Sequence, residues 1–160
     1  MAAVTAGVST LGVKFGYGVS TGSTPSTFTQ LERCNSIGGI SLSTEQIDAS
    51  ALEDEISRYV AGRQDTGGTW EVVFNATDEV FTQLDTMISA YKGLSSGQKL
   101  WFEVWSPYLK NAFFVVAQPP LHIPMPETNQ NELQTVTMTF TIEEYKGMLT
   151  GVEPTPAGSI

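Results

Sequence analysis

The chain has 160 residues, which fits one domain large enough to bury a core without disulfides or metal. Its single Cys and single His exclude an internal disulfide and a Cys/His zinc cluster within one chain. A net charge of −9 without any basic block argues against a protein that grips nucleic acid through its phosphates.

The composition indicates a mainly β protein with polar, weakly charged faces. Ser and Thr together account for 33 residues, whereas only 16% of residues are charged. The first eight residues lack the basic and long apolar regions of a secretory signal, and no apolar run is long enough for a membrane span. We therefore expect a chain that is made in a reducing cytoplasm and does not bind membranes.

The first 42 residues contain glycines at short intervals. Residues 1–27 predict a flexible N-terminal arm with one short strand near 13–17, because their glycines disfavour a helix. Residues 28–42 alternate loosely around Gly38-Gly39, which predicts a strand with a bulge or bend.

Residues 43–68 form a long polar stretch with few large apolar side chains. Loops of this length are uncommon inside compact domains and are usually functional. We expect this stretch to begin and end in strand and to project between the two strands.

The clearest local signals follow. Residues 69–74 alternate as a half-buried strand does. Thr77 is a candidate helix cap, and apolar residues at three- and four-residue spacing predict a helix over 78–91 that Gly93 ends. A single apolar stripe places this helix on the outside of a sheet.

The last third of the chain returns to strand patterns. Residues 99–105 and 112–117 predict a hairpin, and the Pro-rich residues 118–134 predict an edge segment that leads into a loop. Residues 135–142 alternate Thr with apolar residues without a fault. Residues 148–160 predict a C-terminal extension without core capacity.

No group of residues has the pattern of a catalytic, metal or cofactor site, so we expect neither an enzyme nor a cofactor. His122 is the only histidine and is expected to be partly buried in the edge segment. Cys34 has only Arg33 as a basic neighbour and is expected to be a small core residue. Trp101 and Trp105 share one strand face, where they serve either as a sugar platform or, more commonly, as core or subunit contacts.

The order of these elements resembles a known family. The resemblance rests on Ile37-Gly-Gly-Ile40, on Gly62-Arg-Gln-Asp65-Thr-Gly67, and on the strand, helix, hairpin and Thr-rich strand that follow. Together, residues 28–147 resemble the major tail tube protein of long-tailed, non-contractile (siphovirus-type) bacteriophages.

This resemblance implies a fold and a role. The fold is a β-sandwich or rolled barrel with one flanking α-helix, which contributes strands to the inner barrel of a ring. Six copies form a ring, and stacked rings form the hollow tail tube through which phage DNA passes during ejection. The implied partners are further copies of the chain, a tape-measure protein, a tail terminator and distal tail or baseplate proteins. The implied location is the virion, after assembly in the host bacterial cytoplasm.

Two sets of site residues follow. The long loop mixes acids with two arginines, which allows charge complementarity between identical rings. The inter-ring contact candidates are Asp48, Glu53, Asp54, Glu55, Arg58, Arg63 and Asp65. A strand in an inner barrel shows one apolar face to the core and one polar face to the channel. The lumen-facing candidates are Thr135, Thr137, Thr139, Thr141, Glu71 and Glu103.

Several alternatives stay open. The Thr residues could instead face outer solvent or a neighbouring subunit, because Thr also favours strands by itself. The chain could belong to the tube of a contractile or type VI secretion-like machine. A carbohydrate-binding β module that uses Trp101 and Trp105 is a further alternative.

Overall fold

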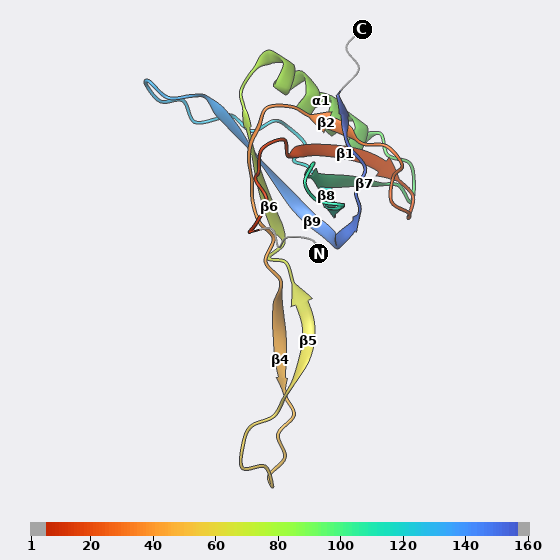
Figure 1. Cartoon of the computed structure of the whole chain (residues 1–160), viewed down its shortest axis with the longest axis vertical. Coiled ribbons are helices and arrows are strands. Elements are labelled where there is room, and N and C mark those ends of the chain that lie inside the picture. Colours follow the sequence, from red (N-terminus) through yellow and green to blue (C-terminus); the bar gives the residue numbers. More distant parts are fainter. Residues whose placement is uncertain (1–5, 157–160) are drawn as a thin grey trace.

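The computed structural model describes residues 6–156. Figure 1 shows a β body from which one long hairpin projects, with a single helix on the opposite side of the body. The elements are β1 (Lys14–Ser20), β2 (Thr29–Leu31), β3 (Cys34–Ile37), β4 (Ser43–Asp48), β5 (Tyr59–Asp65), β6 (Thr69–Asn75), α1 (Asp78–Lys92), β7 (Lys99–Trp105), β8 (Asn111–Gln118), β9 (Thr135–Thr150) and β10 (Thr155–Pro156).

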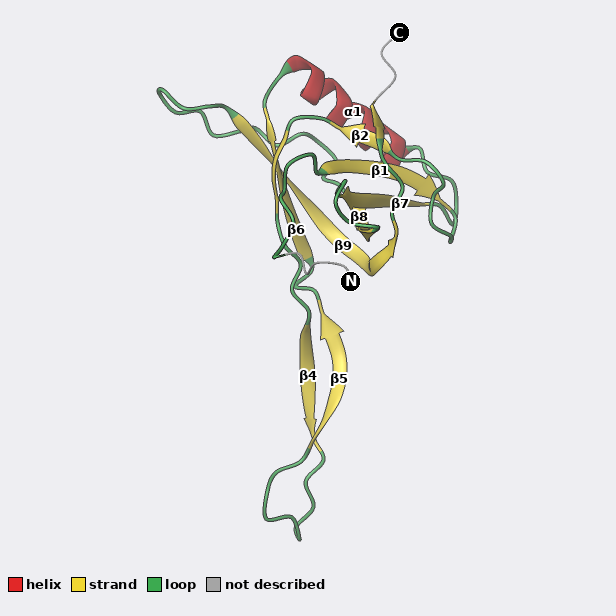
Figure 2. Ribbon diagram, in the orientation of Figure 1, coloured by secondary structure: helices red, strands yellow, loops and turns green. Residues whose placement is uncertain are grey.

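Eight strands form one curled sheet, in the order β10-β2-β1-β7-β8-β9-β6-β3. All neighbours are antiparallel except β10 and β2, which run parallel. The projecting strands β4 and β5 pair only with each other, as a separate two-stranded sheet. The expected mainly β architecture with a curled sheet and one flanking helix is confirmed (Figure 2).

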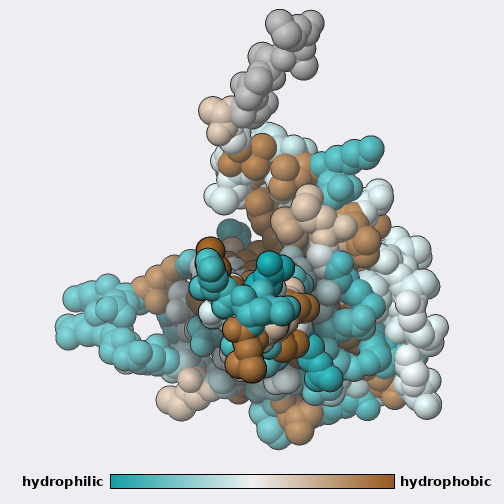
Figure 3. All heavy atoms as spheres, turned by 90° about the horizontal axis from the view of Figure 1, so that it is seen from below, coloured by the Kyte–Doolittle hydropathy of each residue, from teal (hydrophilic) through white to brown (hydrophobic). Residues whose placement is uncertain are grey.

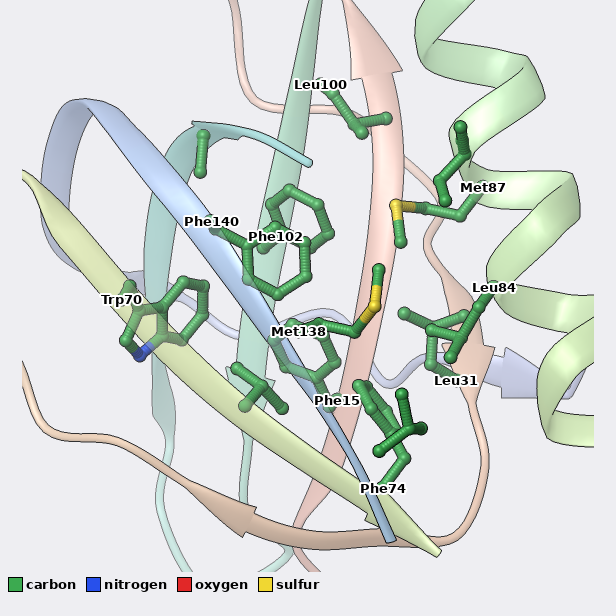
Figure 4. Packing of buried hydrophobic residues seen from close by; sticks show 14 of the residues in the cluster. Phe15, Leu31, Trp70, Phe74, Leu84, Met87, Leu100, Phe102, Met138 and Phe140 are labelled. Atoms are coloured by element: carbon green, nitrogen blue, oxygen red, sulfur yellow. The ribbon is translucent and has the colours of Figure 1, made fainter. Parts of the chain in front are cut away.

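Aromatic side chains fill the space inside the curl. Phe15 on β1 stacks on Phe102 of β7 at 5.5 Å and also lies 5.9 Å from Phe74 of β6. Phe102 lies 4.6 Å from Phe140 of β9. Since β1 and β6 are far apart in the strand order, these contacts show that the two halves of the sheet fold over one another around a shared core (Figure 4).

The helix α1 closes this core on one side. The Thr77 hydroxyl accepts a hydrogen bond from the Val80 amide, and two acids occupy the first turn, where the helix dipole favours them. Leu84 and Met87 point from the helix into the core beside Leu31 (Figure 4). The expected helix over 78–91 is therefore confirmed with one further residue. Within residues 6–156, no helix has the length and apolar character that crossing a membrane requires.

The short strand expected near 13–17 is confirmed as β1, but the flexible arm expected over residues 1–27 is wrong for its second half. The strand β1 lies inside the sheet between β2 and β7, and Phe15 is buried. Its glycines serve close packing: a Cβ on Gly16 would lie 2.9 Å from Pro154, and one on Gly18 would lie 2.8 Å from the Thr27 carbonyl oxygen. The domain therefore begins well before residue 28, while residues 1–5 lie outside the described part of the chain.

The expected C-terminal extension over 148–160 also needs correction. The strand β9 continues to Thr150, beyond the predicted end at Ile142. After it, Pro154 is buried and β10 pairs with β2, where the Thr155 amide donates to the Phe28 carbonyl at 2.9 Å. Residues 151–156 thus belong to the domain, and residues 157–160 lie outside the described part.

Two further segments differ from their predictions. Residues 28–42 form two short strands, because Arg33 takes a φ of 56° and breaks the strand between them. Residues 119–134 form no strand, so the predicted edge segment is wrong. Ile123 packs against the main core, and the part that leads into β9 makes a second projection (Figure 2).

Candidate assembly surfaces

The hairpin of β4 and β5 is the main candidate for a contact between subunits. Its ladder runs from the Ser43–Asp65 pair to the Asp48–Tyr59 pair, and every residue of β4 is exposed. It extends away from the body, so nothing else within residues 6–156 covers it (Figure 1). An isolated two-stranded hairpin is at best marginally stable in water, and this one therefore needs a partner to gain fixed packing.

Apolar side chains on the hairpin face solvent. The two largest exposures are at the tip, where Leu52 is fully exposed and Ile56 is 81% exposed. Figure 3, which looks at the hairpin from its tip, shows apolar and polar side chains mixed on this end. Single exposed apolar residues need no explanation, but a group of them on a projection marks an interaction site. The exposed apolar residues of the hairpin are Ile47, Leu52, Ile56, Tyr59 and Val60.

Local hydrogen bonds give the tip a defined shape. The Arg58 guanidinium lies 3.3 Å from the Asp54 carboxylate, and the Ala51 amide donates to the same carboxylate at 2.8 Å. The Ser50 hydroxyl accepts from the Arg58 amide at 2.7 Å. The Asp48 carboxylate accepts from the Ser50 amide, and this bond lowers the pKa of Asp48.

Hydrogen bonds also fix the base of the hairpin to the body. The Asp65 carboxylate accepts from the Gly67 amide at 2.9 Å, and the Gly68 carbonyl accepts from the Ile142 amide of β9 at 2.9 Å. Gly67 and Gly68 both take a positive φ, which glycine adopts without strain. The hairpin therefore leaves the body through a turn that glycine makes possible.

The structure places all seven inter-ring candidates on this one projection. Asp48 ends β4, Arg63 and Asp65 lie on β5, and the other four lie in the tip. Sequence reasoning found the charges but missed the exposed apolar residues among them. The signal was present, since Leu52 and Ile56 are isolated large apolar residues in a polar run.

A second candidate surface is the outer face of β6 and β9. Glu71 pairs with Thr139, and Val73 pairs with Thr137, so these side chains share a face that points away from the core. Five of the six lumen candidates lie together on this face: Glu71, Thr135, Thr137, Thr139 and Thr141. Asn35 of β3 continues the polar surface by donating to Asn75 at 2.8 Å. The face carries hydroxyl and amide groups and one carboxylate. Neither residues 69–75 of β6 nor residues 135–142 of β9 include a Lys or an Arg.

The prediction that the sixth candidate, Glu103, faces a lumen is wrong. Its alternation with Trp101 is as predicted, but residues 151–156 cover this face of β7, and Glu103 is fully buried. Trp101 is buried too, at 3% exposure, which removes the sugar platform on which the carbohydrate-binding alternative depends.

The two nucleophile or base candidates have no supporting site. Cys34 is half-buried beside the core, and burial raises the pKa of its thiol to about 12. His122 is exposed, and not partly buried as predicted. Within residues 6–156, no three His, Cys, Asp or Glu side chains gather in a way that would hold a metal ion.

An apolar groove of about 660 Å³ opens beside the β3 edge. Ile37 and Ile40 line one side, and Val104, Phe113 and Tyr145 line the other. Its walls carry no cluster of titratable groups, so it has the character of a packing surface.

Comparison with known proteins identifies the fold. No family model and no curated protein matches the sequence. A chain in the cryo-EM structure of the anti-feeding prophage baseplate, six-fold symmetrised, superposes with a TM-score of 0.54 at 12% identity and covers 92% of this chain and 98% of its own length. A chain in the tail of an empty gene transfer agent particle, refined with helical and C6 symmetry, gives a TM-score of 0.55 at 10% identity and covers 88% and 96%. The chain therefore has the fold of subunits found in phage-tail-like particles.

Proposed function

We propose that this chain is a structural subunit of a phage-tail-type particle. More specifically, six copies form a ring, and rings stack into a hollow tube through which DNA passes. The observation that carries the proposal is the projecting hairpin, which leaves Leu52 and Ile56 in solvent on a chain whose fold recurs in six-fold symmetric tail structures. Such a hairpin gains packing only against another molecule, and a neighbouring copy is the partner that a symmetric assembly provides.

The face of β6 and β9 fits the inner wall of such a tube. Thr137, Thr139 and Thr141 present uncharged hydroxyls, and Glu71 adds a negative charge. Cations on the wall would bind phosphates, whereas a neutral or acidic wall lets DNA slide. Six copies, each with a net charge of −9, give a ring a formal charge of −54. We therefore propose a passive conduit and not a nucleic-acid binder.

The proposed role is not enzymatic. Support comes from the chemistry of the two candidate groups: the Cys34 thiol has its pKa raised to about 12, and His122 is exposed and does not line the apolar groove beside β3. The proposed partners are further copies of the chain and the other tail proteins at the ends of the tube and inside it. The proposed location is the virion, after assembly in the host cytoplasm.

A second candidate function is a tube or hub subunit of a contractile or secretion-like machine. The likeness to a chain of the anti-feeding prophage baseplate favours keeping it. A hub subunit differs from the proposed tube subunit in how far the assembly grows, because a hub forms a ring of limited height while a tube subunit stacks without a fixed limit.

Negative-stain electron microscopy of the purified chain tests the proposal. We expect rings, or tubes of variable length. In a matched variant, an Asn-Gly turn replaces residues 49–58 and joins Asp48 to Tyr59, which already pair. This variant keeps the ladder but lacks the tip, and we expect folded monomers from it. Dispersed monomers from the unmodified chain at high concentration, or normal tubes from the variant, would contradict the proposal.

A further inference from the structure

The segment Gly151–Pro156, which we call the strap, crosses the outer side of the sheet. It leaves the end of β9, passes over β7 and β1 and reaches β2 (Figure 1). Along this path the Val152 amide donates to Glu103, Glu153 pairs with Lys14 of β1, and Pro154 packs against Gly16. The strap thus contacts three strands in turn.

The strap covers a second apolar cluster, on the opposite face of the sheet from the main core. Trp101 of β7 and Phe114 of β8 meet edge-on at 6.4 Å, and Phe28 lies 5.6 Å from Phe114. Val152 of the strap packs against this cluster. Without the strap, part of this apolar surface would face water.

A carboxyl group lies under the strap in an unfavourable position. Glu103 is 0% exposed; its Oε2 accepts from the Val152 amide at 2.8 Å, and its Oε1 has no hydrogen-bond partner. Its neighbours across the ladders are Gly16 and Phe114, which offer no polar side chain. A buried carboxylate with a single hydrogen bond is costly, whereas an uncharged carboxyl costs much less.

The charged groups around Glu103 are engaged elsewhere. Lys14 of β1 pairs with Glu153 of the strap at 2.8 Å. Lys146 of β9 pairs with Glu144 and lies over the Trp101 ring. The β8 residues on this face, Ala112, Phe114 and Val116, are apolar. Among the described residues, no ion pair includes Glu103.

We propose that the strap docks reversibly on its own subunit and that Glu103 controls the docking, because the docked strap buries this carboxyl group with a single hydrogen bond. Two features make release possible. The strap begins at Gly151, and its sheet pairing is only the two-residue strand β10. The Lys14–Glu153 pair is partly exposed, and such pairs stabilise little. The proposal concerns a single chain and goes beyond the proposed role in a tube.

The direction of the pH dependence follows from burial. Burial raises the pKa of Glu103 from 4.5 to about 7, and the Val152 hydrogen bond opposes this shift. Release of the strap admits water and returns the pKa toward 4.5. The docked state therefore binds more protons between these two values. Docking is strongest below pH 4.5, weakens by up to about tenfold per pH unit as the pH rises to about 7, and then levels off.

Release has a structural consequence at β2. The strap occupies the free edge of this strand through the Thr155 amide, which donates to the Phe28 carbonyl at 2.9 Å. When the strap leaves, the edge and the apolar cluster become available together. An unpaired strand edge beside apolar surface readily accepts another strand.

Hydrogen–deuterium exchange of the full chain at pH 5, 6, 7 and 8 tests the proposal. The readout is the protection of the four amides in the strap, those of Gly151, Val152, Glu153 and Thr155, corrected for intrinsic exchange at each pH. We expect protection to fall by up to about tenfold per unit from pH 5 to 7 and to change little from pH 7 to 8. In Glu103→Gln, which keeps an acceptor oxygen for Val152, we expect no such fall. The control Glu71→Gln changes an exposed position of β6, and its strap should lose protection with rising pH as the unmodified chain does.

A second variant acts from the strap side and leaves β7 unchanged. Val152→Pro removes the amide that donates to Glu103, so we expect residues 151–156 to exchange rapidly at every pH, including pH 5. This variant tests whether the contact between Val152 and Glu103 holds the strap, even where Glu103→Gln does not fold. Equal protection at pH 5 and pH 8 in the unmodified chain would overturn the proposal. So would wild-type protection at pH 5 in Val152→Pro.

Discussion

Glu71 of β6 lies directly opposite Thr139 of β9, so candidates from two distant stretches of sequence share one exposed face. The next pair on this face, Val73 and Thr137, continues it along the strands. The buried partners between them, Val72 and Met138, fix which way the face points, because a strand alternates its side chains. This pairing makes the face of β6 and β9 a surface that can be tested as a unit.

Positive charge introduced on this face tests whether the face lines a channel. With Thr137→Lys and Thr139→Lys in every copy, twelve cations per ring would surround passing phosphates. We expect assembly to persist, but DNA ejection from particles to slow at low salt and to recover as salt is raised. The matched control is Thr82→Lys with Thr86→Lys, on the exposed side of α1. Normal ejection at low salt from the strand variant would show that this face is not the channel wall.

The hairpin tip should matter for assembly and not for folding. In Leu52→Asp with Ile56→Asp, two exposed apolar residues become charged. We expect the free energy of unfolding to change by no more than about 0.5 kcal/mol, because neither side chain packs within the subunit. Sedimentation velocity should show monomers where the unmodified chain forms large particles. Thr82→Asp with Ser89→Asp on α1 is the control, and it should assemble normally.

The helix should act as a packing element. Leu84 is fully buried between α1 and the sheet, so Leu84→Asp places an unpaired charge in the core. We expect a loss of about 3–5 kcal/mol, enough to unfold a marginal domain. Circular dichroism during heating measures it. Thr82→Asp, two residues away on the exposed side of α1, should melt as the unmodified chain does; equal melting of the two variants would mean that Leu84 is not in the core.

Glycine at position 16 should be required for close packing. Its missing Cβ leaves room for Pro154, which a Cβ would approach at 2.9 Å. We expect Gly16→Ala to cost about 1–3 kcal/mol in urea unfolding, because the strap or β1 must shift. Gly39→Ala is the control, since nothing lies within 4 Å of its Cβ position. A Gly16→Ala variant as stable as the control would contradict the docked position of residues 151–156.

The Cys34 thiol should be slow to react. Its pKa is raised by burial from 9.0 to about 12, so the thiolate fraction at pH 8 falls about 1000-fold relative to an unperturbed thiol. We expect labelling by a thiol reagent at pH 8 to be correspondingly slow in the folded chain and fast in urea. Rapid labelling of the folded chain would show that the thiol is accessible and ionised.

The parts of the fold that the sequence predicted are those with a local period. The strand at 69–74, the strand at 135–142 and the helix at 78–91 each carry their own pattern of apolar residues, and the structure has all three. The resemblance supplied the curled sheet, because no local pattern states which strands are neighbours. The order of strands depends on contacts between residues that are distant in the sequence.

The errors have a common physical origin. The glycines of residues 1–27 disfavour a helix and so predict an arm around one short strand, but Gly16 and Gly18 are required by close contacts with Pro154 and Thr27, which lie outside that strand. The strand alternation predicts the correct face for Glu103, but it also predicts that Glu103 faces a channel, because nothing local indicates that residues 151–156 cover it. The local sequence pattern of an exposed strand residue is the same as that of a residue that a remote segment covers.

The central claim is that copies of this chain form six-membered rings whose channel is lined by β6 and β9. A cryo-EM reconstruction of the assembled protein tests it most directly. The account predicts six copies per layer, with Thr137, Thr139 and Glu71 on the inner wall and the hairpin of β4 and β5 packed against another copy. A reconstruction with these three residues on the outer surface, or with the hairpin free in solvent, would contradict it.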